Sequence, residues 1–161
     1  VSRTRSESDR RRSYLSLQPE VFDTLTPVHV SVPERVVFVC TANSARSQLA
    51  ETIWRGSSEI PAASAGTHPG STVNPGAVAV AERHGLRIDR DARPLPVEEV
   101  LLERDLVVTV CDSAHERMTG RDDLHWSIPD PAPSGTPEAF ERAFDLISRR
   151  IAALTSRLRS V

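Results

Sequence analysis

The sequence contains no lysine, and all 20 of its basic residues are arginine. This absence excludes lysine chemistry, both a Schiff base and the phosphate-binding lysine of P-loops. Only two cysteines occur, too few for a disulfide framework, and they would need histidine or carboxylate partners to form a zinc site. We therefore expect a reduced chain in the cytoplasm.

Strong net charge and long apolar runs are also absent. The formal net charge of −2 argues against a protein whose whole surface binds nucleic acid. No apolar run approaches the ~20 residues of a membrane span, and the Arg- and Ser-rich N-terminus lacks the apolar segment of a signal peptide. We therefore expect no membrane partner. The 161 residues, 39% of them hydrophobic, are about enough for one soluble domain with its own core.

The first 33 residues differ in composition from the rest of the chain. Residues 1–12 hold five arginines against two acidic residues, Glu7 and Asp9, a local net charge of +3. A basic N-terminal extension over residues 1–33 and a folded domain over residues 34–161 are therefore expected. Within the extension, the pattern predicts a short strand, a helical turn and a linker at residues 13–17, 18–25 and 26–33.

From Arg35 onward the pattern alternates between strands and helices. Continuous apolar runs such as Val36–Val39 suit strands that are buried on both faces of a parallel sheet. Stretches with helical spacing of apolar residues follow these runs. The alternation predicts an α/β fold with a doubly wound parallel sheet. The expected strands are residues 36–39, 61–65, 106–110 and 125–128, and the expected helices are residues 47–57, 75–85, 96–102, 113–119 and 138–158.

The end of the first buried strand carries the strongest chemical signal. Ligands of open α/β sheets bind beyond the carboxyl ends of strands, where Cys40 lies here. The small residues that follow can turn their N–H groups inward to bind an anion, and Arg46 can grip two oxygens of a tetrahedral oxyanion. Both effects favour the thiolate of Cys40, and Ser47 can donate a hydrogen bond to it. The expected oxyanion-binding residues are Thr41, Ala42, Asn43, Ser44, Ala45 and Arg46.

A carboxyl group far downstream complements this loop. Asp130 lies between Pro129 and Pro131, where it can protonate a leaving oxygen. An Asp–Pro pair is also common in plain turns, so the assignment of Asp130 depends on the Cys40 loop. A thiolate below a bound oxyanion, with an acid nearby, is typical of phosphatase or arsenate chemistry.

The sequence resembles the low-molecular-weight protein tyrosine phosphatase superfamily and, within it, the arsenate reductases. The resemblance implies a three-layer α/β/α fold with a four-stranded parallel sheet. It also implies Cys40 as nucleophile, Arg46 as oxyanion ligand, Asp130 as acid, and Asn43 as the residue that shapes the loop, hydrogen-bonded to Ser64. The matching segments are VVFVCTANSARSQLAE (36–51), SAGTHPG (64–70), VNPGAVAVAERHGL (73–86), DLVVTVCDSAHE (105–116), HWSIPDPAPSG (125–135) and the last helix.

Within the superfamily, the sequence favours a reductase over a phosphatase. Tyrosine phosphatases of this kind usually carry tyrosine just after the Asp–Pro of the acid loop, whereas Ala132 and Pro133 follow here. Aromatic walls for a phenyl ring are scarce, with only Trp54 and Trp126 as candidates for the mouth of the site. The run around Cys111 looks more like that of the reductases.

Reduction of arsenate requires a second thiol. Thioredoxin-coupled reductases use two further cysteines, and Cys111 resembles the first, but no cysteine occurs near residues 117–119. Either Cys111 forms a disulfide with Cys40, or an external thiol takes over, and an inert Cys111 in the core is the alternative. Mycothiol with mycoredoxin, glutathione, and thioredoxin are the candidate donors. The resemblance also implies a structural potassium ion near Asn43 and Glu51. The spacings of His68, His84, His115 and His125 predict surface or loop roles and no metal site.

The extension has a resemblance of its own. Residues 10–25, RRRSYLSLQPEVFDTL, look like the wing hairpin and trailing helix of arsenic-repressor-type winged-helix regulators. This implies a fusion of a repressor with the reductase domain, with DNA as a partner only in that case, whereas a basic tail is the alternative. Three functions therefore remain open: arsenate reductase, phosphatase acting on phosphotyrosine or small phosphomonoesters, and a non-catalytic oxyanion sensor attached to a DNA-binding module.

Overall fold

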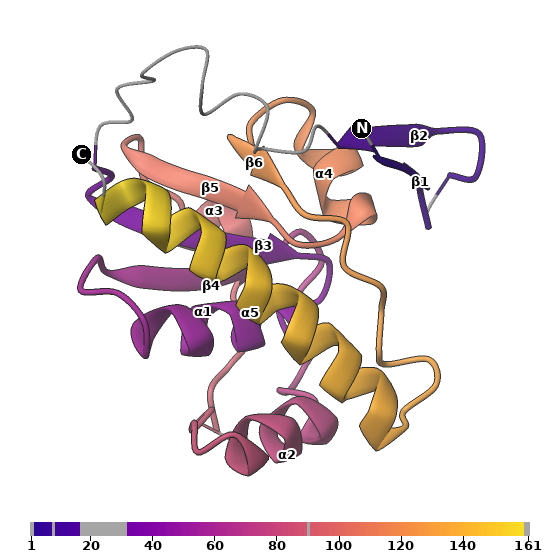
Figure 1. Cartoon of the computed structure of the whole chain (residues 1–161), viewed down its shortest axis with the longest axis vertical. Coiled ribbons are helices and arrows are strands. Elements are labelled where there is room, and N and C mark those ends of the chain that lie inside the picture. The colour runs from indigo at the N-terminus through magenta and orange to yellow at the C-terminus, as the bar shows by residue number, and fades with distance from the viewer. Residues whose placement is uncertain (1, 8, 17–31, 90, 160–161) are drawn as a thin grey trace.

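A four-stranded parallel sheet forms the centre of the molecule in the computed structural model, which describes residues 2–7, 9–16, 32–89 and 91–159 (Figure 1). The strand order is β4-β3-β5-β6. This arrangement confirms the predicted three-layer α/β/α fold with a four-stranded parallel sheet. The strands are β3 (Arg35–Cys40), β4 (Ala62–Gly66), β5 (Asp105–Thr109) and β6 (Leu124–His125), and the helices are α1 (Arg46–Arg55), α2 (Pro75–Arg83), α3 (Val97–Val100), α4 (Asp112–Met118) and α5 (Pro137–Arg159).

Strand β3 occupies the middle of the sheet because its sequence is apolar on both faces. Val36–Val39 are completely buried, and β3 pairs in parallel with β4 on one side and β5 on the other. The ring of Phe38 in β3 packs against the rings of Trp54 and Trp126, and the ring centroids are 5.8 Å apart in each pair. Cys40 therefore ends the best-buried strand of the fold, at the edge of the sheet where ligands bind.

The helices begin and end near their predicted positions. The Asn74 side chain accepts a hydrogen bond from Gly76 N at 2.8 Å, which caps α2, and Pro75 is its first residue. Gly85 follows α2 with φ +73°, a conformation that favours glycine and stops the helix. The long helix α5 buries one apolar stripe against α1 and α2, and it crosses the front of the sheet in Figure 1.

Strand β6 is shorter than predicted. It ends at His125, whereas the sequence suggested a strand over residues 125–128. Trp126 N still donates to Thr109 O at 2.8 Å, but Ile128 N bonds to Trp126 O, so the chain turns away from the ladder ahead of Pro129. This turn directs the following segment, which contains Asp130, across the carboxyl end of the sheet.

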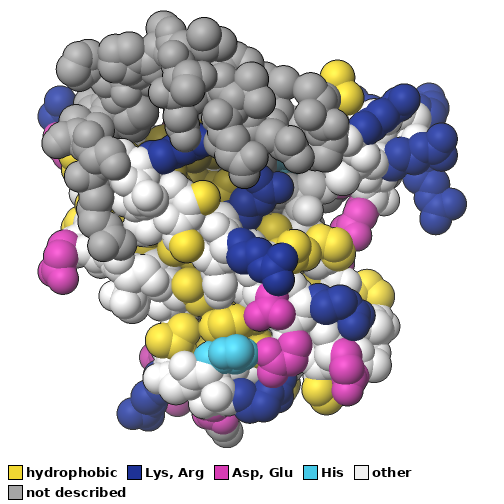
Figure 2. All heavy atoms as spheres, viewed as in Figure 1, with side chains coloured by type: hydrophobic (Ala, Val, Ile, Leu, Met, Phe, Trp, Pro, Cys, Tyr) yellow, Lys and Arg dark blue, Asp and Glu magenta, His cyan; other side chains and the backbone are white. Residues whose placement is uncertain are grey.

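The N-terminal extension forms a hairpin in its described part. Strands β1 (Ser2–Arg5) and β2 (Ser13–Ser16) pair antiparallel, and the sequence had predicted only the second of them. Tyr14 attaches the hairpin to α4, since its hydroxyl group donates to Glu116 Oε1 at 2.9 Å. Figure 2 shows basic side chains gathered where the hairpin lies in Figure 1. The helical turn expected at residues 18–25 and most of the expected linker lie outside the described residues.

Within the described part of the chain, no helix is both long and apolar enough to span a bilayer.

Candidate active site

The loop between β3 and α1 presents its carbonyl groups to a neighbouring segment. Four of these oxygens accept backbone hydrogen bonds from residues 67–74: Cys40 O from Thr67 N (3.0 Å), Thr41 O from His68 N, Ala42 O from Gly70 N and Ser44 O from Asn74 N (2.8 Å each). The N–H and C=O groups of a peptide unit point in opposite directions. The loop therefore turns N–H groups toward its own centre and forms a cradle whose geometry suits an anion.

Asn43 fixes the shape of this cradle. Its φ of +50° is left-handed, a region that asparagine tolerates better than most residues. Its buried side-chain amide donates to Ser47 Oγ and Ser64 Oγ at 2.9 Å each, and its Oδ1 accepts from Leu95 N at 2.9 Å. The expected contact between Asn43 and Ser64 is therefore present. Gly66 lies beneath the loop, where a Cβ would come within 2.7 Å of Thr41 O.

Cys40 lies at the base of the cradle. Its side chain is buried, its Sγ accepts a hydrogen bond from Asn43 N at 3.2 Å, and Ser47 Oγ lies 3.1 Å away. The N-terminus of α1, a ten-residue helix, begins at Arg46 beside it. A backbone N–H group, a hydroxyl group and a helix N-terminus therefore surround the sulfur of Cys40.

Arg46 reaches across the pocket to the acid loop. Its buried guanidinium donates to Ile128 O at 2.9 Å and pairs with Asp130 Oδ2 at 3.0 Å. Asp130 Oδ1 accepts from Ala132 N at 3.1 Å, as in an Asx-type turn. The structure thus brings together the cysteine, the arginine and the aspartate that the sequence singled out across 90 residues.

Cys111 lines the same pocket as Cys40. It caps the N-terminus of α4, where its Sγ accepts from Ala114 N at 3.4 Å and lies 3.5 Å from Thr41 Oγ1. Burial raises the pKa of the Cys111 thiol, and the positive charge of Arg46 offsets this only in part. The second thiol is therefore placed near the first but is held mainly in its protonated form.

The N-terminal hairpin supplies part of the pocket that sequence reasoning missed. The pocket measures about 870 Å³, and its wall includes Arg5, Glu7 and Arg10 of the extension. Glu7 Oε2 lies 3.9 Å from Arg46 and accepts from Asp130 N at 3.3 Å. Burial raises the pKa of Glu7, although Arg46 opposes this shift. The basic composition of residues 1–12 was the only sequence signal for this contribution.

Two aromatic residues do not lie where the sequence suggested. Trp54 and Trp126 were candidates for the mouth of the site, but they are 0% and 6% exposed and pack on Phe38 in the core. Their large apolar rings bury more surface against the sheet than the polar mouth offers. Ala132 and Pro133 line the mouth instead.

Two of the predicted surface histidines are partly buried. His68 and His84 lie in exposed contacts with Arg117 and Glu141. His115 and His125, in contrast, stack on each other beneath Tyr14. Burial lowers the pKa of His125, so its ring is neutral near pH 7.

The fold and the site together define a class of protein. A thiol below a cradle of backbone N–H groups, with a guanidinium beside it and a carboxyl group opposite, is the arrangement of α/β enzymes that attack oxyanions with a cysteine. Residues 35–161 match the family described as low molecular weight phosphotyrosine protein phosphatase. The chain belongs to this family of enzymes.

Individual relatives support the same assignment. An arsenate reductase of Halalkalibacterium halodurans is 35% identical over 127 residues, which cover 72% of this chain and 91% of that protein. The crystal structure of an arsenate reductase from Archaeoglobus fulgidus matches with a TM-score of 0.66 and 30% identity, covering 75% of this chain and 98% of that one. A low molecular weight protein tyrosine phosphatase from T. tengcongensis matches with a TM-score of 0.66 and 27% identity, over 76% of this chain and 97% of that one.

Proposed function

We propose that this protein reduces arsenate to arsenite. The observation that carries the proposal is the mouth of the pocket that holds the Cys40–Arg46 cradle, where Ala132 and Pro133 stand in place of an aromatic wall for a phosphotyrosine ring. The similarity to proteins named arsenate reductase supports it. The two cysteines are free, as a thiol-dependent enzyme working in the cytoplasm requires.

Binding of the oxyanion uses the cradle and Arg46. The inward N–H groups of residues 41–46 surround the oxygens of arsenate, and the guanidinium of Arg46 donates to two of them. Arg46 is positioned for this by its hydrogen bond to Ile128 O. Phosphate has the same tetrahedral shape and charge, so it competes for the same groups.

The first chemical step forms a bond between Cys40 and arsenic. The Cys40 thiolate attacks arsenic, and one hydroxyl group of the arsenate leaves as water after it takes a proton from Asp130. Asp130 Oδ2 lies 3.0 Å from the guanidinium of Arg46, so both groups can reach the same oxyanion. Ser47 Oγ, 3.1 Å from Cys40 Sγ, stabilises the thiolate.

The second step transfers two electrons. A second thiolate attacks the sulfur of Cys40, a disulfide forms, and the electron pair of the S–As bond stays on arsenic, which leaves as arsenite. The attacking thiol is either Cys111 or an external thiol. The raised pKa of Cys111 disfavours its thiolate at neutral pH. We therefore propose that an external thiol, mycothiol with mycoredoxin, glutathione or a thioredoxin, completes the reaction.

Phosphatase activity is the second candidate function. The arrangement of Cys40, Arg46 and Asp130 suits hydrolysis through a phosphocysteine equally well. Ala132 and Pro133 at the mouth offer no aromatic wall for a phosphotyrosine ring, which favours the reductase.

The residues expected to bind potassium do not fit a free ion well. Asn43 Oδ1 accepts a hydrogen bond from Leu95 N, and the Glu51 carboxylate pairs with the guanidinium of Arg55. The arginine supplies the positive charge that the ion would bring. We route no step of the mechanism through potassium.

We propose that residues 34–161 are the catalytic domain and that residues 1–33 are an extension whose hairpin borders the pocket. The hairpin at residues 2–16 has the antiparallel form of a wing, but its Tyr14 side packs on α4. Gel-shift titration of the purified chain with duplex DNA tests whether it also binds DNA.

One experiment separates the functions. Purified protein is given arsenate with the mycothiol/mycoredoxin, glutathione/glutaredoxin or thioredoxin system, and p-nitrophenyl phosphate in parallel. Arsenite release that disappears in Cys40→Ser supports the reductase. Phosphate release without arsenite from any donor shows the phosphatase, and oxyanion binding without either product shows the sensor.

A further inference from the structure

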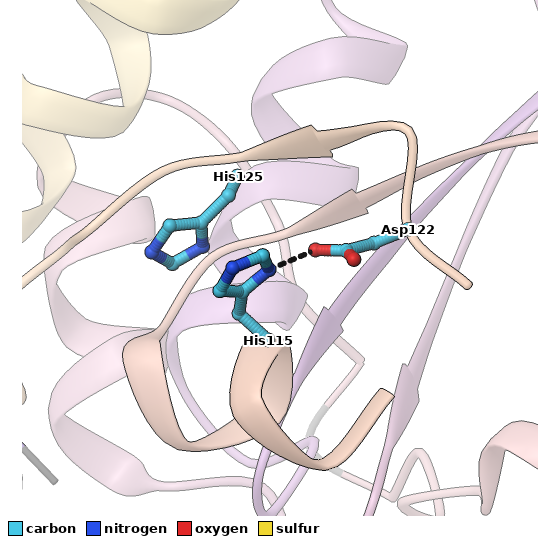
Figure 3. A group of neighbouring side chains, drawn as sticks. All are labelled: His115, Asp122 and His125. Carbon is cyan, nitrogen blue, oxygen red and sulfur yellow. Dashed lines mark hydrogen bonds and ion pairs between the residues drawn. The ribbon is translucent and has the colours of Figure 1, made fainter. Parts of the chain in front are cut away.

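Three side chains beside the catalytic pocket point toward one another from different elements. His115 belongs to α4, Asp122 to the segment that follows it, and His125 to β6 (Figure 3). One ligand atom from each lies within 4.8 Å of the other two. The spacing of the histidines in the sequence predicted no metal site, so this convergence is a product of the fold.

A buried carboxylate orients one of the two imidazole rings. His125 Nε2 lies 3.0 Å from Asp112 Oδ1, and the Asp112 side chain is 2% exposed. The other oxygen of Asp112 accepts from Glu7 N at 2.8 Å. A carboxylate accepts only, so the neutral ring of His125 carries its proton on Nε2 and has a lone pair on Nδ1. Metal-binding histidines show this same arrangement, with the second nitrogen donating to a carboxylate.

One hydroxyl group lies among the acceptors around that lone pair. Thr109 Oγ1 lies 2.6 Å from Asp122 Oδ2, 3.0 Å from His125 Nδ1 and 3.3 Å from Leu124 O. Its single hydroxyl proton can serve one of these three acceptors at a time. The Asp122 side chain is 2% exposed, and its Oδ2 has a second partner in His115 Nδ1 at 2.6 Å. A cation that replaces this contact would bind His115, Asp122 and the lone pair of His125 Nδ1 together.

The ligand chemistry selects the kind of cation. Two imidazole nitrogens and one carboxylate oxygen suit Zn²⁺ and similar divalent transition metals, whereas Mg²⁺ and Ca²⁺ prefer oxygen ligands. We propose that His115, Asp122 and His125 form a binding site for a divalent transition-metal ion of the Zn²⁺ type, with its fourth position open to water.

Binding requires a modest adjustment. Two ligands at about 2.0–2.1 Å from a zinc ion are at most ~4 Å apart, and the three ligand atoms here lie within 4.8 Å of one another. His115 is the ligand that can move, since a third of its side chain is exposed, whereas His125 is held by Asp112. His115 Nδ1 now lies 2.6 Å from Asp122 Oδ2 and would exchange that contact for the metal.

The proposed site connects two elements that carry pocket residues. Helix α4 begins directly after Cys111, and β6 leads within five residues to Asp130. A bound ion would therefore restrain both, whichever reaction the pocket performs. The site does not depend on the proposed function, because none of its three ligands lines the pocket.

Titration with Zn²⁺ tests the proposal. The pocket thiols also bind zinc, so the experiment uses the full chain with Cys40→Ser and Cys111→Ser. Isothermal titration is expected to show one ion per chain, and Co²⁺ is expected to give the visible absorption of a tetrahedral N/O site. In that background, His115→Ala and Asp122→Asn should each weaken Zn²⁺ binding by about 100-fold or more. Asp112→Asn, which alters the carboxylate that orients His125 and leaves the three ligands in place, should weaken it by about 10–100-fold.

His84→Ala is the matched control, because His84 is exposed and lies outside the cluster. It should leave the Zn²⁺ affinity unchanged. Circular dichroism confirms that each variant is folded. If a more buried variant does not fold, the Zn²⁺ affinity of His115→Ala decides between the outcomes, since a third of the His115 side chain is exposed. Equal affinities in His115→Ala and His84→Ala would overturn the proposal, as would the absence of stoichiometric Zn²⁺ binding in the isothermal titration.

Discussion

At the scale of single residues, Asn43 shows how one side chain holds a reactive loop. The amide group joins the loop to β4 through Ser64, to α1 through Ser47 and to the segment before α3 through Leu95 N. Its left-handed backbone turns the loop over Cys40. No other polar side chain of the loop makes as many contacts to separate elements among the described residues.

Asn43→Ala should therefore affect both stability and activity. It leaves buried polar partners unpaired and places alanine at a positive φ, so we expect a loss of about 1–3 kcal/mol in the free energy of unfolding. Urea denaturation measures this loss. Ser64→Ala is the matched control, since it removes one of these contacts and should lose only about 0.5–1.5 kcal/mol. Equal stability of Asn43→Ala and the unmodified protein would contradict this role.

Asp130→Asn tests the assignment of the acid. The amide cannot protonate the leaving oxygen, so p-nitrophenyl phosphate turnover should fall by about 10²–10⁴-fold. The measurement is kcat at saturating substrate, with Asp145→Asn on the exposed side of α5 as the control. An unchanged kcat would remove Asp130 from the mechanism.

Cys111 offers a test of the raised thiol pKa. In Cys40→Ser, Cys111 is the only cysteine, and burial raises its pKa. Only the thiolate reacts with iodoacetamide, so alkylation should be slow at neutral pH and accelerate about tenfold per pH unit up to about pH 9. Mass spectrometry follows the reaction, with the urea-unfolded variant as the faster control. A rate that is already constant between pH 7 and 8 would show that the thiolate is stabilised instead.

At the scale of elements, the contact between α2 and α5 depends on a residue without a side chain. Gly76 lies in the first turn of α2, and a Cβ there would come within 2.3 Å of the buried ring of Phe140. Alanine ordinarily favours a helix over glycine by about 1 kcal/mol. At this position, steric overlap with a fully packed ring outweighs that preference.

Gly76→Ala should thus lower the free energy of unfolding by about 1–3 kcal/mol, although alanine has the higher helix propensity. Gly56→Ala is the matched control, because a Cβ at Gly56 meets its neighbours at an ordinary 3.5 Å and its φ is −80°. The control should change stability by no more than about 0.5 kcal/mol. Thermal and urea denaturation compare the pair, and a stabilised Gly76→Ala would show that Phe140 moves aside at little cost.

At the scale of the whole molecule, the N-terminal hairpin and the segments around Cys40 and Asp130 share one pocket. The hairpin brings Glu7, a second carboxyl group, within 3.9 Å of Arg46. Burial raises the pKa of this carboxyl group, so it carries its charge only above that raised pKa. Once ionised, Glu7 competes with an anionic substrate for Arg46.

Glu7→Gln should therefore lower the KM for arsenate, by roughly two- to fivefold at a pH above that raised pKa, where Glu7 is charged. The difference should shrink as the pH falls through the raised pKa, because the protonated carboxyl group no longer repels the substrate. Steady-state kinetics between about pH 5 and pH 8 measure this. Glu141→Gln, on the exposed surface beside Arg83 and His84, is the control. An equal KM in both variants across this range would show that the hairpin does not influence substrate binding.

Much of this molecule could be predicted because its signals are local. The apolar run Val36–Val39, the cap at Asn74 and the stripe of α5 specify their elements through burial and hydrogen bonding that depend only on neighbouring residues. The short loop from Cys40 to Arg46 could be predicted for the same reason, since a strand followed by small residues and a helix leaves the backbone few ways to turn. The predictions that were wrong concern contacts between residues far apart in the sequence. Trp126, for example, faces the core because its ring packs on Phe38.

The sequence by itself determined the α/β fold, the family and the cysteine–arginine cradle, since these follow from patterns within a few residues or from a chain-long resemblance. Only the tertiary structure decided that Asp130 meets Arg46, that Cys111 shares the pocket with Cys40, that the basic extension brings Glu7 to the mouth, and that two histidines converge on Asp122. These contacts join residues between seven and 123 positions apart. Their geometry is set by how the elements pack against the sheet, and spacing along the chain does not encode it.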